Sequence, residues 1–302
     1  MPVAEAKPRL GFRHVLFATD FSASADLALP FAVSVAHRFG STLYVTHIMS
    51  QQPWPGVAPE EASHTFDQRR RQAERQLSNL LNAECMRGIP EQAILQEGDL
   101  RTAISQIAEK RDIDLVVVGS HGRHGFRRLL LGSKAEDILE GTTCPVLIVG
   151  PRVAPEKTSP SMQRVLFPTD FTPETLRAFP YALMLGNHPE CKLMLLHAVE
   201  EPPRNQLRDP ERAVNYLRTR LRDLVPADAG LPCEPELVIV FGAAAQQILK
   251  TAKEWHADVI VLGEHHPGPY SAHLLGDTGY DVACHAPCPV LVVCTRNRDD
   301  KR

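Results

Sequence analysis

The sequence predicts an α/β fold of two tandem domains, each built on a five-stranded parallel sheet with helices on both faces. Three observations support this prediction. The chain repeats itself at the length of a domain, short apolar runs alternate with helical patterns in both halves, and a glycine-rich loop follows the fourth apolar run. Strands that alternate with helices favour a parallel sheet covered on both sides. Right-handed crossovers then give a doubly wound fold, which holds ligands at the carboxyl ends of its strands.

Four sequence landmarks occur twice in the same order, which indicates a duplicated domain. They pair His14–Ser22 with Arg164–Thr172, Gly98 with Gly242, Asp114–Gly119 with Asp258–Gly263, and Thr143–Val149 with Pro287–Val293. The length of 302 residues suits two domains of about 150 residues each. We expect a first domain over residues 1–151, a linker over 152–161 that is rich in proline, serine and charged residues, and a second domain over 162–302.

The expected elements follow the same order in both halves. In the first half, apolar runs of strand length occur at Val15–Ala18, Leu43–Ile48, Ala93–Gln96, Leu115–Val118 and Val146–Val149. Helical spacing predicts helices over Ser24–Phe39, Glu61–Arg87, Leu100–Lys110 and Lys134–Glu140. The long helix has one apolar face, formed by Ala73, Leu77, Leu80, Leu81 and Cys85. The second half repeats the pattern, with later strands at Leu193–Ala198, Glu236–Phe241, Val259–Leu262 and Val290–Val293.

A loop rich in glycine and cations lies between the fourth strand and the helix after it, which has Ser133 near its N-cap. It begins Gly119-Ser120-His121-Gly122, continues for nine residues and ends in Gly132-Ser133. Glycines let backbone N–H groups approach an anion, and a helix N-terminus adds unpaired donors and a partial positive charge. From 119 to 134 there is no acid, and the cations are Arg123, Arg127, Arg128 and Lys134. The pattern predicts a phosphate site; plain turn glycines and solvated loop arginines are the alternatives.

Asp20 follows the first strand as the glycine loop follows the fourth, so both reach the crevice at the carboxyl ends of the strands. We interpret Asp20 as a pocket residue. The alternative is an N-cap for the next helix, because Asp is a favoured cap. The basic run of Arg69, Arg70, Arg71 and Arg75 lies among acidic and amide residues on the long helix, which favours a solvated helix face.

These motifs together resemble the universal stress protein (UspA) family. The matching features are the Thr-Asp-Phe after the first strand, the Gly-x-x-Gly-(nine)-Gly-Ser loop, and the Cys-Pro-Val-Leu-Ile-Val run at the last strand of the first half. The resemblance covers nearly the whole chain as two tandem domains. It implies Rossmann-like, flavodoxin-like domains of the adenine nucleotide alpha hydrolase type that bind ATP, with Mg²⁺ on the phosphates, or another adenine nucleotide. It also implies a role in stress survival, dimerisation through the last strand of each domain, and, in tandem members, pairing of the two domains within one chain. We expect both this intramolecular pairing and a homodimer through the last strands.

The resemblance assigns the nucleotide site residue by residue. Ala18, Thr19 and Asp20 match the adenine and ribose end, and Ile48 matches an apolar position near the base. Val118 and Gly119 match the pocket wall at the end of the fourth strand. The phosphate and ribose contacts match Gly122, Gly132, Ser133 and the amide of Lys134. From charge alone we add Arg123 and Arg127 as phosphate contacts, because guanidinium suits phosphate geometry.

The second half departs from this pattern. His266 replaces the second loop glycine and Asp277 replaces the serine. Over 119–134 the first loop carries four cations and no acid (+4), whereas over 263–278 the second carries Glu264 and Asp277 and no cation (−2). Such a difference at close range costs a polyanion several kcal/mol in a partly desolvated site. We therefore expect the second domain not to bind ATP in the manner of the family. A degenerate half kept for dimerisation is favoured over one that takes a nucleoside-sized or uncharged ligand.

The second half is also rich in metal-ligand residue types: Glu264, His265, His266, His273, Asp281, Cys284, His285 and Cys288. Two of these positions recur in the first half and the cysteine spacing is not that of a zinc clip, so ordinary structural roles are favoured over a metal site. Seven dispersed cysteines read as reduced thiols in a cytoplasmic protein. The net charge of −3 suggests neither nucleic acid nor a membrane surface as partner, and no run has the length of a signal-peptide core or a membrane span.

The sequence shows no nucleophile elbow, no Walker-type Gly-Lys-Ser and no carboxylate pair placed for acid–base catalysis, so no catalytic residues are assigned. The leading hypothesis is a stress-response protein whose nucleotide state alters its assembly or its partner binding. A nucleotide-independent interaction module is one alternative. A slow ATPase or other nucleotide-processing enzyme is another, because fold alone does not exclude it.

Overall fold

The computed structural model describes residues 11–50, 59–120, 131–154, 160, 162–200, 210–265 and 275–295. The first half contains strands β1 (His14–Ala18), β2 (Thr42–Met49), β3 (Glu91–Glu97), β4 (Leu115–Gly119) and β5 (Val146–Val149). Its helices are α1 (Ala23–Phe39), α2 (Pro59–Leu81), the 3₁₀ turn η1 (Glu84–Met86), α3 (Leu100–Lys110) and α4 (Ser133–Gly141).

The second half repeats this order. Its strands are β6 (Arg164–Pro168), β7 (Lys192–Val199), β8 (Glu236–Phe241), β9 (Val259–His265) and β10 (Val290–Thr295). Its helices are α5 (Pro173–Gly186), α6 (Pro210–Asp223), α7 (Ala244–Glu254) and α8 (Asp277–His285). The predicted alternation of strands and helices is therefore confirmed in both halves, and the fold is α/β with a mostly parallel sheet.

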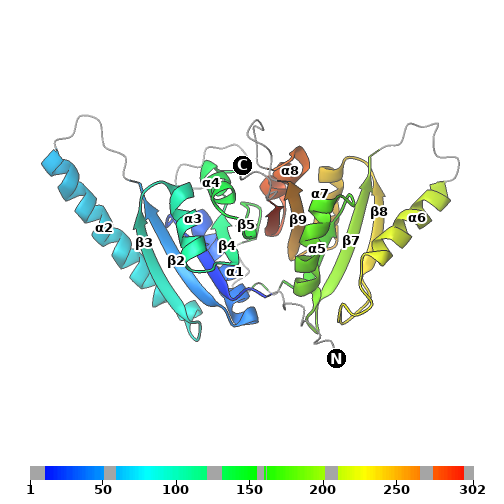
Figure 1. Cartoon of the computed structure of the whole chain (residues 1–302), viewed down its shortest axis with the longest axis horizontal. Coiled ribbons are helices and arrows are strands. Elements are labelled where there is room, and N and C mark those ends of the chain that lie inside the picture. The colour runs from blue at the N-terminus through cyan, green and yellow to red at the C-terminus, as the bar shows by residue number, and fades with distance from the viewer. Residues whose placement is uncertain are drawn as a thin grey trace, which may run out of the picture.

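The ten strands form one sheet in the order β3-β2-β1-β4-β5-β10-β9-β6-β7-β8. Within each half all the neighbouring strands are parallel. The halves meet where β10 pairs antiparallel with β5, with Leu291 opposite Leu147. Figure 1 shows the two halves side by side around this pair, with α2 and α6 at opposite ends. Both β5 and β10 have a strand on each side, so their hydrogen-bonding edges are occupied within the chain.

The helices cover both faces of the sheet, as expected for a doubly wound fold. One face packs against α1, α2, α5 and α6, and its buried residues include Phe17, Leu77, Phe167, Ala178 and Leu221. The other face packs against α3, α4, α7 and α8, and its buried residues include Leu16, Ile104, Ile138, Ile248 and Val282. Within the described residues, no helix is long and apolar enough to cross a membrane.

The long helix of the first half is shorter than predicted. α2 ends at Leu81 and the chain continues into η1, so the prediction of a helix to Arg87 is wrong at its end. Ala73 and Leu77 are buried as expected, but Cys85 is exposed and Met86 is buried in its place. The direction of the chain changes after Leu81, and this change rotates Met86 rather than Cys85 toward the core.

The carboxyl ends of the parallel strands position the residues that matter for a site. Asp20 follows β1, and Gly98, with a φ of 135°, turns the chain after β3. That positive φ suits glycine, which has no Cβ to clash. Asp99 then caps α3 by accepting a hydrogen bond from the Thr102 amide at 3.0 Å. The N-cap of α4 is Gly132, not Ser133, and it makes no side-chain capping bond.

Candidate functional site

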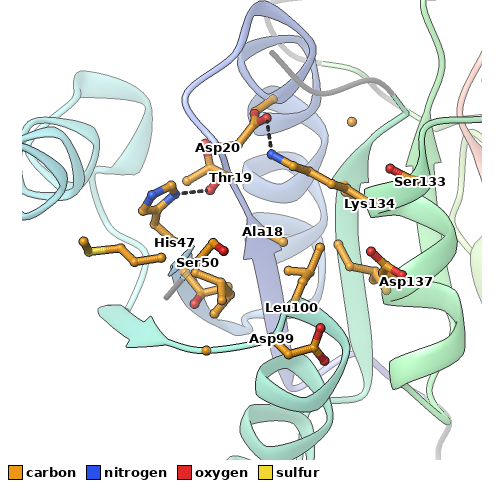
Figure 2. Close-up of a pocket in the computed structure, with 18 of the residues that line it drawn as sticks. Ala18, Thr19, Asp20, His47, Ser50, Asp99, Leu100, Ser133, Lys134 and Asp137 are labelled. Carbon is orange, nitrogen blue, oxygen red and sulfur yellow. Dashed lines mark hydrogen bonds and ion pairs between the residues drawn. The ribbon is translucent and has the colours of Figure 1, made fainter. Parts of the chain in front are cut away.

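A cavity of about 620 Å³ lies in the first half at the carboxyl ends of β1, β2, β3 and β4. Figure 2 shows its labelled residues, which come from strand ends and from the beginnings of α3 and α4. This is the crevice where doubly wound sheets hold ligands, and its volume is in the range of small-molecule sites. Its apolar wall includes Ala18, Ile48, Leu100, Val118 and Ile138.

An ion pair joins two sides of the cavity. The Lys134 ammonium at the start of α4 lies 3.0 Å from a carboxylate oxygen of Asp20 after β1 (Figure 2). The other Asp20 oxygen accepts the Ser22 amide at 3.1 Å. The Asp20 side chain is 16% exposed and that of Lys134 is 49% exposed. Burial alone would raise the pKa of Asp20, but the Ser22 and Lys134 interactions together hold it below its ordinary value.

Asp20 is not the cap of α1. The N-cap is Ser22, whose hydroxyl accepts the Ala25 amide at 3.4 Å, while Asp20 precedes it in an Asx turn. The alternative reading of Asp20 as a helix cap is therefore wrong. Its carboxylate faces Lys134 and the cavity, as a pocket residue should.

His47 forms part of the same wall, next to Thr19. Its Nδ1 lies 2.8 Å from the Thr19 carbonyl (Figure 2). Its ring centroid lies 4.7 Å from that of Phe21. The second half repeats both contacts with His197, Thr169 and Phe171. Because the arrangement occurs in both halves, we interpret His47 as part of the scaffold that holds the β1 end in place.

The start of α4 gives the cavity two further features. The Ala135 amide donates to the Gly132 carbonyl, so the amides of Ser133 and Lys134 precede the first intrahelical bond. Asp137, one turn further on, also lines the cavity. Burial raises the pKa of Asp137, and the neighbouring carboxylates of Asp99 and Glu140 raise it further.

Gly119 lies on the cavity wall, but its lack of a side chain is required by packing. A Cβ there would lie 2.3 Å from the Ser24 carbonyl oxygen, because α1 crosses directly over the end of β4. Gly263 repeats this contact with Glu174, at 2.5 Å. The glycine at this position is therefore a condition for helix–sheet contact in both halves, whether or not a ligand binds.

Most of the sequence-predicted residues come together. The described cavity wall includes Ala18, Thr19, Asp20, Ile48, Val118, Gly119, Ser133 and Lys134. Gly132 lies one residue before this wall, and its amide donates to the Ser120 carbonyl at 2.8 Å. Gly122, Arg123, Arg127 and Arg128 lie outside the described residues.

Sequence reasoning missed several wall residues. They are Ala25, Thr46, His47, Met49, Ser50, Arg69, Gly98, Asp99, Leu100, Asp137 and Ile138. Arg69 was expected on a solvated face; it is exposed, but it also borders the cavity. Gly98 had a usable signal, because it was a landmark of the repeat directly before an Asp at the end of a predicted strand.

The second half has a smaller cavity of about 410 Å³ at the equivalent strand ends. Asp170 occupies the position of Asp20, but Thr278 stands in place of Lys134, so the ion pair has no counterpart there. Asp170 instead accepts hydrogen bonds from Thr172 and Thr175, which hold its pKa below the ordinary value against the opposing effect of burial. The described wall carries four acids and no basic side chain: Asp170, Glu174, Glu264 and Asp277.

Glu264 places its own carboxylate at the N-terminus of α8. One oxygen accepts the Gly276 amide at 3.3 Å, and the other is so close to Gly279 that a Cβ there would lie 1.9 Å away. In the first half the corresponding residues are Ser120 and Ala135, so the position of Glu264 carries no carboxylate there. Burial raises the pKa of Glu264 to about 7; the Gly276 amide opposes this and Asp170 adds to it.

Within the described residues, no group of three or more His, Cys, Asp or Glu side chains is arranged to hold a metal ion. His266 and His273, which belong to the ligand-rich stretch of the second half, lie outside those residues. The Thr142 hydroxyl and the Cys144 sulfur are in hydrogen-bond contact, and burial raises the pKa of this thiol to about 11.

Comparison with known proteins identifies the protein family to which this chain belongs. The model of the universal stress protein family matches residues 11–150 and again residues 162–294. The chain belongs to this family as a tandem two-domain member, as the sequence motifs predicted.

Three known proteins illustrate the range of similarity. Universal stress protein A homolog 1 of Coxiella burnetii is 32% identical over 141 residues, which cover 46% of this chain and 96% of that protein. The crystal structure of a universal stress protein from Archaeoglobus fulgidus covers 94% of this chain and 98% of its own, with 22% identity and a TM-score of 0.72, and so shows the same fold. A universal stress protein solved in complex with cAMP covers 45% of this chain and 98% of its own, with 26% identity and a TM-score of 0.35.

Proposed function

We propose that the first pocket binds ATP or another adenine nucleotide, and that its occupancy alters assembly or partner binding during a stress response in the cytoplasm. The observation that carries this proposal is the cavity of about 620 Å³ at the carboxyl ends of the strands, bordered by the Asp20–Lys134 ion pair and the start of α4. A half-apolar, half-polar cavity of this size suits a ligand with a flat base at one end and anionic groups at the other.

The walls suggest how such a ligand would lie. The apolar side chains of Ala18, Ile48 and Val118 suit the base. The amides of Ser133 and Lys134, at a helix N-terminus, suit phosphate oxygens. Gly122, Gly132, Arg123 and Arg127 are proposed as further phosphate contacts on the evidence of the sequence alone.

Lys134 has a second role in this proposal. An ion pair with one half-exposed partner contributes only about 0–1 kcal/mol to stability. A phosphate can therefore replace Asp20 as the partner of the ammonium at small cost. The Asp20 carboxylate is then free of the ammonium and can accept hydrogen bonds from the ribose hydroxyl groups, since an ionised carboxylate offers two acceptor oxygens.

Mg²⁺ fits this site only as a companion of the phosphates. Mg²⁺ keeps several waters and usually takes one or two protein carboxylates together with phosphate oxygens. The described part of the pocket offers single carboxylates rather than a cluster of ligands. When bound, the ion would neutralise phosphate charge near the carboxylates of Asp20 and Asp137.

We further propose that the second domain does not bind ATP and acts as a fixed partner of the first. Glu264 puts a carboxylate where a phosphate would contact the α8 N-terminus, and Asp277 adds a second acid there. Pairing through β5 and β10 would take the place of a homodimer through the same strand edges, since both edges are already occupied.

The test is calorimetric titration of nucleotide-stripped protein with Mg-ATP. We expect one site per chain. Lys134→Met should weaken binding about 10- to 100-fold, because a hydrogen bond to a charged group is worth about 1.5–3 kcal/mol. The control is Arg87→Met, which removes an exposed cation paired with Glu84 on η1, outside the pocket.

The outcomes separate the hypotheses. Two sites per chain would contradict the asymmetric model. No binding of any adenine nucleotide would favour the nucleotide-independent interaction module. Release of phosphate during the titration would favour the slow ATPase, which Lys134→Met should then also impair.

A further inference from the structure

Two cysteines of the second half lie next to each other although 42 residues separate them in sequence. The thiol of Cys233, in the segment before β8, donates to the backbone carbonyl of Cys191, directly before β7, with a sulfur–oxygen distance of 3.4 Å. Both residues are free thiols. This contact is unrelated to the pocket of either half.

The strand pairing explains the proximity. β7 and β8 are parallel, with Met194 opposite Glu236 at the start of the ladder. Cys191 lies directly before β7 and Cys233 three residues before β8, so both cysteines lie at the end of the sheet where these two strands begin. The Cys233 sulfur is 3.4 Å from the Cys191 carbonyl oxygen, so the two residues are in contact there. A disulfide requires Cα atoms about 4.4–6.8 Å apart, and rotation of the two side chains toward each other would bring the sulfurs together.

The two thiols differ in access. Cys191 is buried, with 2% of its surface exposed, whereas Cys233 is exposed. Cys233 lies on the wall of a cavity of about 770 Å³ that also carries Arg218 and Arg222 of α6. A small oxidant can reach Cys233 through this opening. Redox-sensing cysteines are accessible to solvent and often lie next to a resolving cysteine.

We propose that Cys191 and Cys233 are a redox-sensitive pair that forms an intramolecular disulfide with hydrogen peroxide as the oxidant. The Cys233 thiolate attacks one peroxide oxygen, the O–O bond breaks, and a sulfenic acid and hydroxide are produced. The hydroxide takes up the proton that the Cys233 thiol gave up on ionisation and becomes one water. The Cys191 sulfur then attacks the Cys233 sulfur, the S–O bond breaks, and the leaving hydroxide takes the Cys191 proton as a second water. Two thiols and one peroxide thus give one disulfide and two waters.

Arg38 connects this site to the first half of the chain. From the end of α1 its guanidinium donates to the carbonyls of Met162, at 3.1 Å, and Leu185, and lies 3.5 Å from the Cys191 sulfur. Burial raises the pKa of the Cys191 thiol, and the Arg38 charge opposes that effect. Because a thiolate is the attacking form, Arg38 favours the second step. Disulfide formation in turn draws the Cys191 sulfur away from Arg38, which changes a contact between the halves.

The test treats the reduced full-length protein with hydrogen peroxide, blocks the remaining thiols with N-ethylmaleimide and identifies cross-links by mass spectrometry after trypsin. The sequence suits this assay, because Ala178–Lys192 and Asp223–Lys250 are separate tryptic peptides with one cysteine each. We expect these two peptides to be joined, with the loss of two hydrogen atoms, and to separate again on reduction with dithiothreitol.

Variants make the test specific. Cys233→Ser changes an exposed side chain and should abolish the cross-link in a folded protein. In Cys191→Ala the Cys233 sulfenic acid should persist and react with dimedone. The matched control is Cys85→Ser, which removes an exposed cysteine of the first half and should leave the cross-link unchanged. Arg38→Met should slow cross-linking several-fold.

Three results would overturn the proposal. One is oxidation of Cys233 to sulfinic or sulfonic acid with Cys191 still labelled by N-ethylmaleimide. The other is a cross-link that joins two chains, seen as a doubled mass on a non-reducing gel. A cross-link that persists in Cys233→Ser would do the same, because another cysteine would then be responsible.

Discussion

Glu264 differs from its first-half counterpart, Ser120, in a way that follows from the neighbouring position. Gly279 has no Cβ, so the longer side chain of Glu264 fits against α8, and its carboxyl group comes to the Gly276 amide. Ala135 stands at the matching position of α4. One paired change, to Glu and Gly together, therefore accounts for much of the difference in shape and charge between the two pockets.

Glu264 should make the stability of the protein depend on pH near neutrality. Its folded pKa is about 7 against an ordinary value of 4.5, so the folded chain holds a proton that the unfolded chain has lost. The stabilising effect is complete below about pH 4.5 and is lost as the pH rises through about 7. Glu264→Gln should remove this dependence and raise the unfolding free energy above pH 7 by up to about 3 kcal/mol.

The measurement is urea unfolding of both proteins between pH 5 and 8, compared as a difference so that other titrating groups cancel. The control is Asp277→Asn, an exposed carboxylate on the first turn of the same helix, for which little change is expected. Parallel curves for the native protein and Glu264→Gln would show that Glu264 titrates normally, and the account of the second pocket given above would fail.

Residues that act through their backbone or their charge type could be predicted from the sequence, whereas those that act through a specific rotamer could not. Val118 ends a predicted strand, Asp20 and Gly119 come just after predicted strands, and all three lie on the cavity wall. The sequence assigned only the amide of Lys134 to the site, because the reach of its ammonium to Asp20 depends on how α4 lies against β1. Asp277 was recognised as an acid that opposes phosphate. The position of the Glu264 carboxylate depends on Gly279, fifteen residues away in sequence but adjacent in space.

At the level of elements, the contact of α1 with β4 sets the geometry of the first pocket. The end of β4 lies directly under the Ser24 carbonyl, and the equivalent contact in the second half lies between Gly263 and Glu174. Each contact fixes the beginning of a helix relative to a strand end. The positions of Asp20 and Asp170 depend on it, since Asp20 lies in the short segment that leads from β1 into α1, and Asp170 lies in the segment that leads from β6 into α5.

Gly119→Ala should therefore destabilise the protein by about 1–3 kcal/mol, the usual effect of overpacking, because the obstructing atom belongs to the backbone. Gly150→Ala is the control. This glycine directly follows β5, and a Cβ there would meet its nearest atom, the Ala283 carbonyl oxygen, at 3.4 Å. Urea unfolding measures both. Equal effects of the two substitutions would contradict the packing role assigned to Gly119.

Helices and strands with a single clear period were predicted to within a residue or two. α3 and β5 begin and end where the sequence predicted, because each lies between strong turn signals. The predicted end of α2 lies six residues beyond its observed end at Leu81. Its apolar spacing continues past Leu81 into η1. Spacing alone therefore does not show that the α-helix ends and a 3₁₀ turn follows. The end of such a helix depends on what the following segment packs against, here Met86 and Ile89 in the core.

For the molecule as a whole, the antiparallel pairing of β5 and β10 is the feature that the repeat alone did not determine. A duplicated domain whose last strand is apolar has two options: it can pair with its copy in the same chain or with another chain. In this structure the pairing is within the chain, and the outer edges of the sheet are β3 and β8. Contacts of Arg38 and Ser34 with residues 160–191 add polar interactions between the halves.

The intact chain should accordingly be a monomer, whereas residues 11–154 expressed alone should self-associate. Separation from the second half exposes the hydrogen-bonding edge of β5, an apolar run of four residues, and an exposed apolar edge strand readily pairs with another chain. Light scattering after size-exclusion chromatography measures both masses, and circular dichroism checks that the isolated half is folded. Added residues 162–295 should convert the self-associated form to a one-to-one complex, because β10 offers the native partner with the register Leu147 to Leu291.

A folded isolated half that remains a monomer would mean that the β5 edge does not drive association. A full-length homodimer would have to use another surface, since both central strands are already paired within the chain.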